Sequence, residues 1–391
     1  MPTRVYILPI IVFSQFCCTS LWFAGNAIII DLIENFNLEF SALAHLTSAV
    51  QFGFIIGTFV FAIFSIADRF SPSKVFFACA TVAAAINSLT ILQTNTIESL
   101  FFIRLATGFF LAGIYPVGMK IASDYFKEGL GKSLGYLVGA LVLGTAFPHL
   151  LNFYQGSLSW KWVVYITSGL ALLGGGLLLL FISDGPYKTK LEKFDISLFY
   201  SVFKIKHFRK AAFGYFGHMW ELYAFWAFVP FILKEYIEHH ESFTFNISLF
   251  SFVVIGIGGL SCVLSGYLSQ KFTSKLIATL SLSLSFLCCL LSPLFFVLNT
   301  KLLFLGFLVF WGMAVIADSP LFSTLVAQNV PSKAKGTALT IVNCIGFAIT
   351  IISIQLLNML QNYITPKYLF LVLAIGPAIG LFGLYRSYLR S

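Results

Sequence analysis

Apolar runs, each long enough to cross a bilayer, follow one another along almost the whole chain. A membrane-spanning helix needs about 20 mostly apolar residues. Twelve such runs can be counted in the 391 residues, at 5–30, 42–67, 74–94, 97–120, 133–153, 161–182, 211–233, 245–268, 275–297, 301–325, 334–357 and 367–386. They lack the every-second-residue alternation of outer-membrane strands, and a helix satisfies its own backbone hydrogen bonds in lipid. We therefore predict an all-α integral membrane protein with twelve transmembrane helices.

The few charged residues also fit a membrane protein. Only 10% of the residues are charged and 59% are hydrophobic, whereas soluble proteins have roughly 25% charged residues. With a cytoplasmic N-terminus, 19 of the 24 Lys and Arg residues fall on the cytoplasmic side, four fall outside and one lies within a span. This positive-inside bias predicts that both termini are cytoplasmic. It also accounts for the net charge of +9 without a basic groove, so we expect no nucleic-acid partner.

The longest polar stretch divides the chain into two halves. It contains seven Lys and Arg residues and separates the sixth run from the seventh. We predict an N-terminal six-helix bundle at 1–182, a cytoplasmic central loop at 183–210 and a C-terminal six-helix bundle at 211–391. Short loops and the lack of an organellar targeting signal favour a bacterial inner membrane.

The two halves share sequence patterns at an offset near 204 residues. The loop FSIADRFSPSK at 64–74 corresponds to GYLSQKFTSK at 266–275. In the fourth run of each half, the segment at 115–135 aligns with that at 319–339, with a proline second in both and a basic, glycine-containing cluster after it. The matches occur at equivalent runs and at one offset, which indicates a duplicated six-helix unit.

Two parallel six-helix repeats are an architecture of secondary transporters, and short motifs make the likeness specific. The segment LFFIRLATG places Leu100, Arg104 and Gly108 in the pattern Leu-x-x-x-Arg-x-x-x-Gly, and the loop after the second run keeps Asp68 and Arg69. In these features the chain resembles the major facilitator superfamily. The resemblance implies two pseudo-symmetric bundles that work by alternating access, with helices one, four, seven and ten lining a central cavity. The Gly-Pro pair of the family's antiporter signature is missing from the fifth run.

Ionisable residues inside the runs are rare, and each needs a cavity or a partner. Glu221 lies near the middle of the seventh run, with His218 three residues earlier on the same helical face. Because burial disfavours the charged form of a carboxyl group, Glu221 can exchange a proton near neutral pH. We predict that Glu221 is the main protonation site and that His218 tunes it. The alternatives are a purely structural hydrogen bond to a neighbouring helix and direct binding of the solute.

Two further charges belong to the same predicted proton-coupling set. Asp318, toward the inner part of the tenth run, is either a second proton or cation site or a contact at a helix kink. Arg104 either assists proton movement, holds an anionic group or locks helices through a salt bridge. In the loop after the second run, Asp68 and Arg69 are the candidate gating residues.

Polar and aromatic side chains in the runs form a candidate solute site, since ligand pockets are mostly apolar with a few fixed polar groups. The set consists of Trp22, Asn26, Tyr115, His149, Trp220, Tyr223 and Trp311. Acidic residues in two of the runs favour a cationic or zwitterionic solute, while Arg104 would accept a carboxylate. For His149, a polar packing contact is the alternative.

The function predicted from the sequence is secondary active transport of a small organic solute, coupled to protons. One alternative is an efflux antiporter for drugs or metallophores, and another is a membrane sensor or enzyme that moves no solute. No nucleotide-binding loop, HExxH motif or CxxC spacing occurs, and the six histidines are scattered. We therefore expect no enzymatic activity, no cofactor and no metal. A monomer suffices for this architecture.

Overall fold

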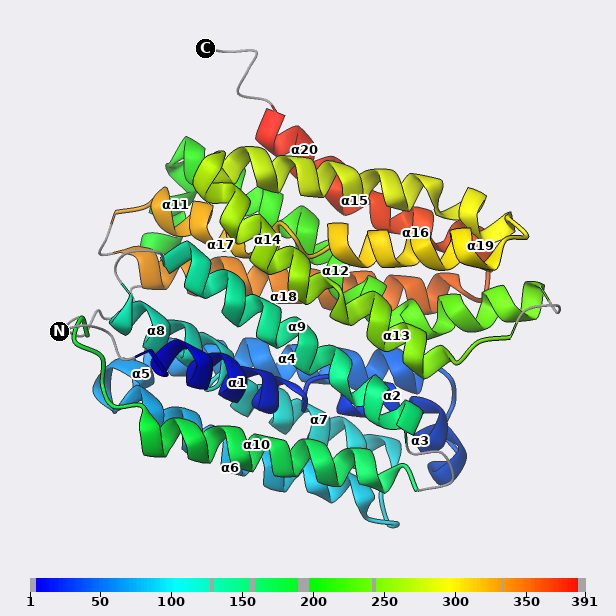
Figure 1. The fold of residues 1–391 in the computed structure, drawn as a ribbon, viewed down its shortest axis with the longest axis horizontal. Coiled ribbons are helices and arrows are strands. Elements are labelled where there is room, and N and C mark those ends of the chain that lie inside the picture. Colours follow the sequence, from blue (N-terminus) through cyan, green and yellow to red (C-terminus); the bar gives the residue numbers. More distant parts are fainter. Residues whose placement is uncertain are drawn as a thin grey trace. The chain divides into compact units, whose positions relative to one another are not determined.

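The computed structural model describes residues 5–126, 130–154, 159–188, 197–240, 244–331 and 334–385. Both chain ends, whose cytoplasmic position the charge pattern predicts, lie outside these ranges. The chain divides into two compact units, Met1–Phe194 and Asp195–Ser391. Figure 1 shows that both units are built from helices, and the described residues contain no strand.

Unit 1 holds the helices of the first six apolar runs. Its elements are α1 (Ile7–Thr19), α2 (Ala24–Ala27), α3 (Ile29–Phe36), α4 (Ala42–Ile63), α5 (Ile66–Arg69), α6 (Pro72–Ser88), η1 (Leu89–Ile91), α7 (Ile97–Leu111), α8 (Tyr115–Tyr125), α9 (Leu130–Tyr154) and α10 (Lys161–Phe181). Helix α4 packs on α7, α6 packs on α10, and α1 packs on both α9 and α10.

Unit 2 holds the helices of the other six apolar runs. Its elements are α11 (Leu198–Lys204), α12 (Lys206–His239), α13 (Ile247–Gly256), α14 (Gly258–Lys271), α15 (Ser274–Val297), α16 (Lys301–Ala314), α17 (Ser319–Gln328), α18 (Lys335–Leu360), α19 (Pro366–Leu369), η3 (Phe370–Ala374) and α20 (Ile375–Tyr385). Helix α12 packs on α17, α18 and α20, and α13 packs on α16. Helix α11 and the start of α12 lie within the predicted central loop, whose residues 189–196 are outside the described ranges.

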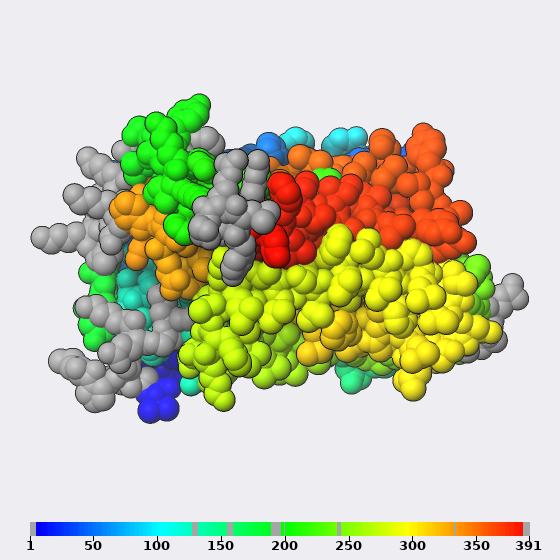
Figure 2. All heavy atoms as spheres, turned by 90° about the horizontal axis from the view of Figure 1, so that it is seen from above, coloured from blue at the N-terminus to red at the C-terminus, as the bar shows by residue number. Residues whose placement is uncertain are grey.

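Within the described residues, ten helices are long and apolar enough to cross a membrane. The 34-residue α12 is less apolar because its middle carries His218 and Glu221, and α1 is a shorter apolar helix. The all-α fold with about twelve membrane helices is therefore confirmed. Helix α15 shows the lipid-type surface most clearly, with a row of exposed leucines on one face, and it forms the yellow-green surface of unit 2 in Figure 2.

Several of the predicted continuous runs are interrupted, and three of these breaks matter for the sites. The first run is broken between α1 and α2 at Ser20–Phe23, which we call the α1–α2 break. The fourth is broken between α7 and α8, and the tenth between α16 and α17. Pro116 and Pro320 stand in the first turn of α8 and α17, where the missing N–H has no helical partner to lose.

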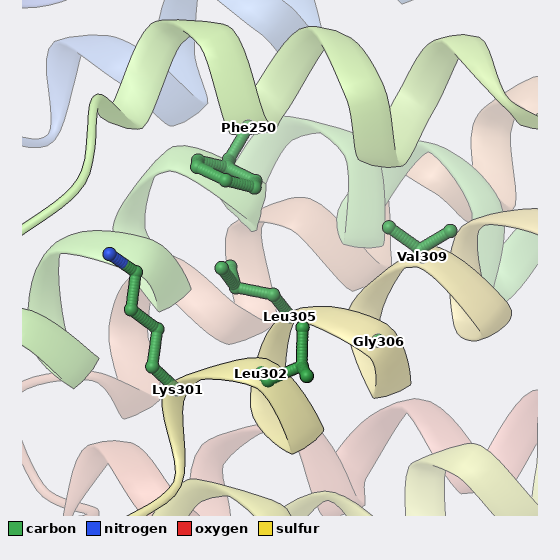
Figure 3. Close-up of a pocket in the computed structure, with 6 residues that line it drawn as sticks. All are labelled: Phe250, Lys301, Leu302, Leu305, Gly306 and Val309. Carbon is green, nitrogen blue, oxygen red and sulfur yellow. The ribbon is translucent and has the colours of Figure 1, made fainter.

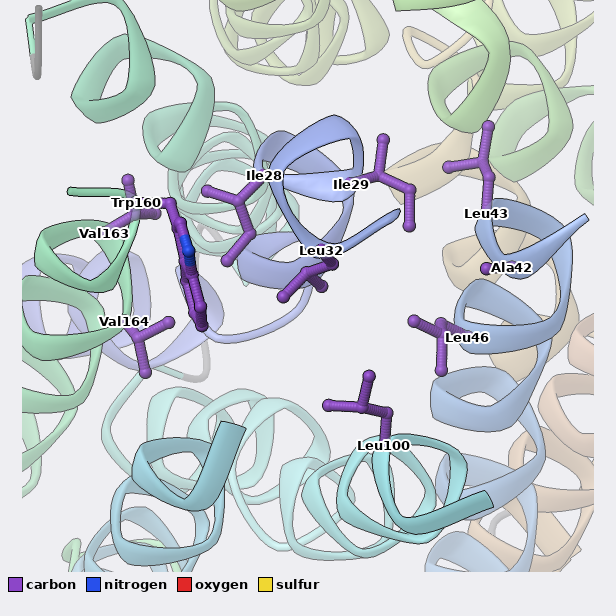
Figure 4. Packing of buried hydrophobic residues seen from close by; sticks show 10 residues of the cluster. All are labelled: Ile28, Ile29, Leu32, Ala42, Leu43, Leu46, Leu100, Trp160, Val163 and Val164. Carbon is purple, nitrogen blue, oxygen red and sulfur yellow. The ribbon is translucent and has the colours of Figure 1, made fainter. Parts of the chain in front are cut away.

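A compact apolar cluster holds the end of unit 1 at which α4, α7 and α10 begin. Figure 4 shows the side chains of Leu32, Leu46 and Leu100 directed toward one another from α3, α4 and α7. Trp160 and two valines of α10 close the cluster on the other side. This cluster holds α3 against the first turns of α4, α7 and α10.

Close helix contacts recur at the same positions of both units. A Cβ added to Gly108 of α7 would lie 2.0 Å from the carbonyl oxygen of Val50 in α4. A Cβ added to Gly312 of α16 would lie 2.0 Å from the carbonyl oxygen of Val254 in α13. Gly312 stands 204 residues after Gly108, and Val254 stands 204 residues after Val50. The offset found in the sequence thus connects structurally equivalent contacts, as duplication requires.

We expect Gly312→Ala to lower the thermal unfolding midpoint in detergent, because the new methyl group meets backbone that cannot rotate away. Overpacking of this kind costs about 1–3 kcal/mol. Gly306→Ala on the same helix is the matched control, since a Cβ there meets nothing within 4 Å, and alanine favours a helix over glycine. Equal midpoints for the two variants would contradict the close packing of α13 and α16.

Candidate proton and solute sites

Glu221 joins three helices of unit 2. Its side chain lies in α12 with 1% of the residue exposed. The Oε1 atom accepts hydrogen bonds from Ser285 Oγ at 2.5 Å, Trp311 Nε1 at 2.6 Å and Cys289 Sγ at 3.3 Å. An indole N–H can only donate, so any proton on this carboxyl group resides on Oε2. Glu221 is thus both a link between α12, α15 and α16 and a group that can hold a proton.

Asp318 and His218 form a second buried contact in unit 2. His218 Nδ1 lies 2.8 Å from Asp318 Oδ1, and both side chains are 1% exposed. The ring N–H is not aligned with the carboxyl oxygen, and neither His218 Nε2 nor Asp318 Oδ2 has a hydrogen-bond partner within the described residues. Asp318 reaches this position because it ends the break between α16 and α17. The pair is thus a buried acid–imidazole contact whose other polar atoms have no hydrogen-bond partner within the described residues.

The sequence paired His218 with Glu221, but the structure gives each a different partner. Three residues of α-helix turn a side chain through roughly 300°, and this difference sends His218 toward α17 and Glu221 toward α15 and α16. We call His218, Glu221 and Asp318 the acid–imidazole cluster.

Arg104 of unit 1 holds the α1–α2 break. Its Nη1 donates to the carbonyl oxygen of Leu21 at 3.1 Å, and its Nη2 donates to that of Trp22. The side chain is 2% exposed, and no carboxylate of the described residues lies within 4.0 Å of it. The described residues therefore do not support a salt bridge of Arg104. The guanidinium group instead binds carbonyl groups that the break leaves without helical partners.

Other candidates for the solute site in unit 1 lie around the same break. The Trp22 ring packs on Phe54 with their centroids 4.9 Å apart. Asn26 Nδ2 donates to Thr47 Oγ1 at 2.7 Å, which supplies the partner that a buried amide needs. His149 of α9 is 2% exposed. Tyr115 is half-buried at the start of α8.

The candidates in unit 2 are engaged in helix packing. Trp311 donates to Glu221, and Trp220 Nε1 donates to the carbonyl oxygen of Val372 at 3.1 Å. The Tyr223 ring packs against Phe347 of α18 with the centroids 5.3 Å apart. The two tryptophans of this set thus use their indole N–H groups in hydrogen bonds within unit 2.

The loop after α4 is tied to the rest of unit 1 by polar contacts. Asp68 lies 2.8 Å from Lys120 of α8, a partner that the sequence did not single out. Arg69 has no carboxylate of the described residues within 4.0 Å. Beyond α10, hydrogen bonds from Lys188 and from Ser71 hold the pKa of the Asp184 carboxyl below its usual value. The loop is therefore anchored to both α8 and the segment after α10.

Sequence reasoning missed several polar residues of these sites. Ser285 and Cys289 were not distinguished from other small residues of an apolar run. Gln51 and Thr145 are completely buried, and their side-chain polar atoms have no hydrogen-bond partner within the described residues. A usable signal existed for α4, where Thr47, Gln51 and Thr58 recur at helical spacing on one face.

Comparison with known proteins assigns the family. The family model described as Major Facilitator Superfamily matches residues 11–354. The chain belongs to the major facilitator superfamily. The solved structure of the human organic anion transporter MFSD10 (TETRAN) is similar, with a TM-score of 0.76 and 12% sequence identity over 98% of this chain and 100% of that one. At this identity the likeness shows the fold alone. No curated protein matches the sequence.

Members of this family are transporters, which favours a transport role over an enzymatic one. Outside the candidate sites, unit 2 also carries an apolar groove of about 520 Å³ between α13 and α16. Figure 3 shows the side chains of Phe250, Leu305 and Val309 around it, with Lys301 at one end. None of the predicted site residues lines the groove, so it is not the candidate solute site.

We expect Glu221→Leu to destabilise the purified protein and Glu221→Gln to leave it almost as stable as wild type. Leucine leaves the Ser285 hydroxyl and the Trp311 N–H buried without an acceptor, at about 1–3 kcal/mol each. Glutamine keeps a carbonyl oxygen for both donors. The measurement is the thermal unfolding midpoint in detergent, with the exposed Glu238 of α12 changed to Gln as the control. If the Leu variant proved as stable as the Gln variant, Glu221 would not hold the three helices together.

Proposed function

We propose that the protein is a secondary active transporter that moves a small organic solute by alternating access and couples this movement to protons. The family assignment supports transport. The observation that carries the coupling is the acid–imidazole cluster, in which three ionisable side chains are each 1% exposed inside the lipid-spanning helices of unit 2. Charged groups at such depth are costly, and a proton that comes and goes is a function that explains their presence.

Within this proposal, the Asp318 carboxyl group is the first proton site. A proton on the Asp318 carboxylate removes its charge and weakens the contact with His218 at 2.8 Å. Asp318 stands where α16 gives way to α17, so this change acts at a discontinuity of a membrane helix. In transporters, discontinuous membrane helices of this kind form the sites for substrate and coupling ions.

Glu221 is the second proton site of the proposal. Its three donors stabilise the carboxylate form, whereas burial inside the bundle penalises a charged side chain. The proposal assigns a proton to this carboxyl group during part of the transport cycle. Because its donors belong to α15 and α16, the protonation state of Glu221 alters contacts among three helices.

Orientation and assembly are parts of the same proposal. The distribution of Lys and Arg residues supports cytoplasmic termini, and we place the protein in a bacterial inner membrane as a monomer. Fusion of a reporter that is active only in the cytoplasm to either terminus tests the orientation.

We expect solute-induced proton flux in proteoliposomes for wild type and its loss in Asp318→Asn and Glu221→Gln. The amides preserve size and hydrogen-bonding oxygens but cannot carry the proton. Amino acids, organic acids, polyamines, sugars and lipophilic cations form the solute panel. Exchange of labelled solute across the membrane without a proton gradient should persist in both variants, which separates coupling from folding.

Glu238→Gln is the control, because this acid lies on α12 in a solvent-exposed contact with Lys234. Undiminished proton flux in both Asp318→Asn and Glu221→Gln would show that the cluster does not couple transport to protons. Solute movement without any proton flux in wild type would make the protein a uniporter or an exchanger.

A further inference from the structure

The α1–α2 break of unit 1 is surrounded by buried polar groups that lack partners. Two contacts fix the position of the break along the length of α9. Gly144 lies against Thr19, where an added Cβ would meet the Thr19 hydroxyl, and Asn152 Nδ2 donates to the carbonyl oxygen of Ala27 at 2.8 Å. His149 lies between Gly144 and Asn152 along α9, so it is level with the break. Its Nε2 has no hydrogen-bond partner within the described residues.

Helix α4 contributes a second unpartnered group at the same level. Thr47 contacts Asn26, and Phe54 packs on Trp22. Gln51 lies between these two on the same face of α4, at the i+4 position from Thr47. It is completely buried, and neither its amide oxygen nor its amide nitrogen has a partner within the described residues. A buried amide with four unused hydrogen-bonding positions is costly unless a ligand fills them.

Arg104 supplies the charge of this region. An arginine carries five N–H donors, and within the described residues Arg104 donates to the carbonyl oxygens of Leu21 and Trp22. Its Nε is buried without a partner. A Cβ on Gly25 would lie 3.4 Å from this Nε, so the Gly25 backbone runs beside the Nε edge of the guanidinium without a side chain between them. The edge formed by Nε and one Nη can bind a carboxylate through two parallel hydrogen bonds.

Unit 2 shows that the fold does not need this arginine. At the position 204 residues after Arg104 it carries Leu308, and the equivalent helix contact, Gly312 on Val254, is just as close. The residues equivalent to Leu21 and Trp22 are Phe225 and Trp226 within the unbroken α12. Within the described residues, the buried arginine and the break beside it thus have no counterpart at the equivalent positions of unit 2. A structural role in helix pairing does not account for them.

We propose that the α1–α2 break is the binding site for the carboxylate group of a small organic anion, with Arg104 as its principal ligand. This inference names the solute class and rests on the proposed transport function. The guanidinium forms the charged contact, and His149 and Gln51 offer further donors at the same depth. The Trp22 ring, which belongs to the break, packs on Phe54, and the two rings provide apolar surface for the rest of the solute. A monovalent carboxylate that moves with one proton carries no net charge across the membrane.

The test is ligand binding to the purified full chain in detergent, measured by calorimetry and by the thermal unfolding midpoint. Lactate, succinate, benzoate and glutarate are each compared with the corresponding neutral amide, and benzylamine serves as the cation. We expect at least one carboxylate to bind saturably while its amide and benzylamine do not. Arg104→Leu should weaken that binding about tenfold or more, since a hydrogen bond to a charged group contributes that much.

Two further variants keep the result interpretable. Arg104→Lys retains the charge but not the planar pair of donors, so binding should weaken less than in Arg104→Leu. If the leucine variant folds poorly, the affinity of the lysine variant is compared with that of wild type. Lys234→Gln removes an exposed cation of unit 2 and should leave the affinity unchanged. The proposal is overturned if no carboxylate binds, if amides or benzylamine bind equally well, or if Arg104→Leu retains wild-type affinity.

The proposed anion site and the proposed proton coupling can be refuted independently of each other. Carboxylate binding that depends on Arg104, without proton flux in liposomes, would support the anion site and overturn the coupling. Proton flux driven by a cation or a sugar, without carboxylate binding, would support the coupling and overturn the anion site.

Discussion

A charge inside a lipid-spanning bundle must find its partners within the bundle, and this constraint decides the local structure of both units. In unit 1 the cation of Arg104 is met by two backbone carbonyls, which are available only because the first helix is broken. In unit 2 the carboxylate of Glu221 is met by side-chain donors from two other helices. The break and the three-helix junction are thus two solutions to the same problem of desolvation.

The two units share a helix framework but carry opposite chemistry. The contacts of Gly108 with Val50 and of Gly312 with Val254 show that helix pairing was retained through duplication. The ionisable residues were not retained, because Leu308 stands in place of Arg104 and Ser14 in place of His218. In our account unit 1 binds the anionic part of the solute and unit 2 binds the proton.

The sequence predicted the features that depend on composition and on repeated patterns. It did not predict which of several possible partners a buried side chain contacts. The apolar runs identified the helices, and the 204-residue offset identified the repeat. The α1–α2 break was missed because Ser20 and Thr19, whose hydroxyls bond to carbonyls of the preceding turn, resemble ordinary small residues of a membrane helix. The pairing of His218 with Asp318 was missed because the two are 100 residues apart, and only the packing of α12 on α17 brings them together.

The most direct test of this account is whether the buried carboxyl groups of unit 2 exchange protons with the solvent. Infrared difference spectroscopy of the purified protein, recorded as the pH is varied across the physiological range, reports the C=O stretch of protonated carboxylic acids. We predict a band that grows as the pH falls and that loses separate components in Glu221→Gln and Asp318→Asn. A spectrum in which neither substitution alters the pH-dependent band would contradict the assignment of the proton to this cluster.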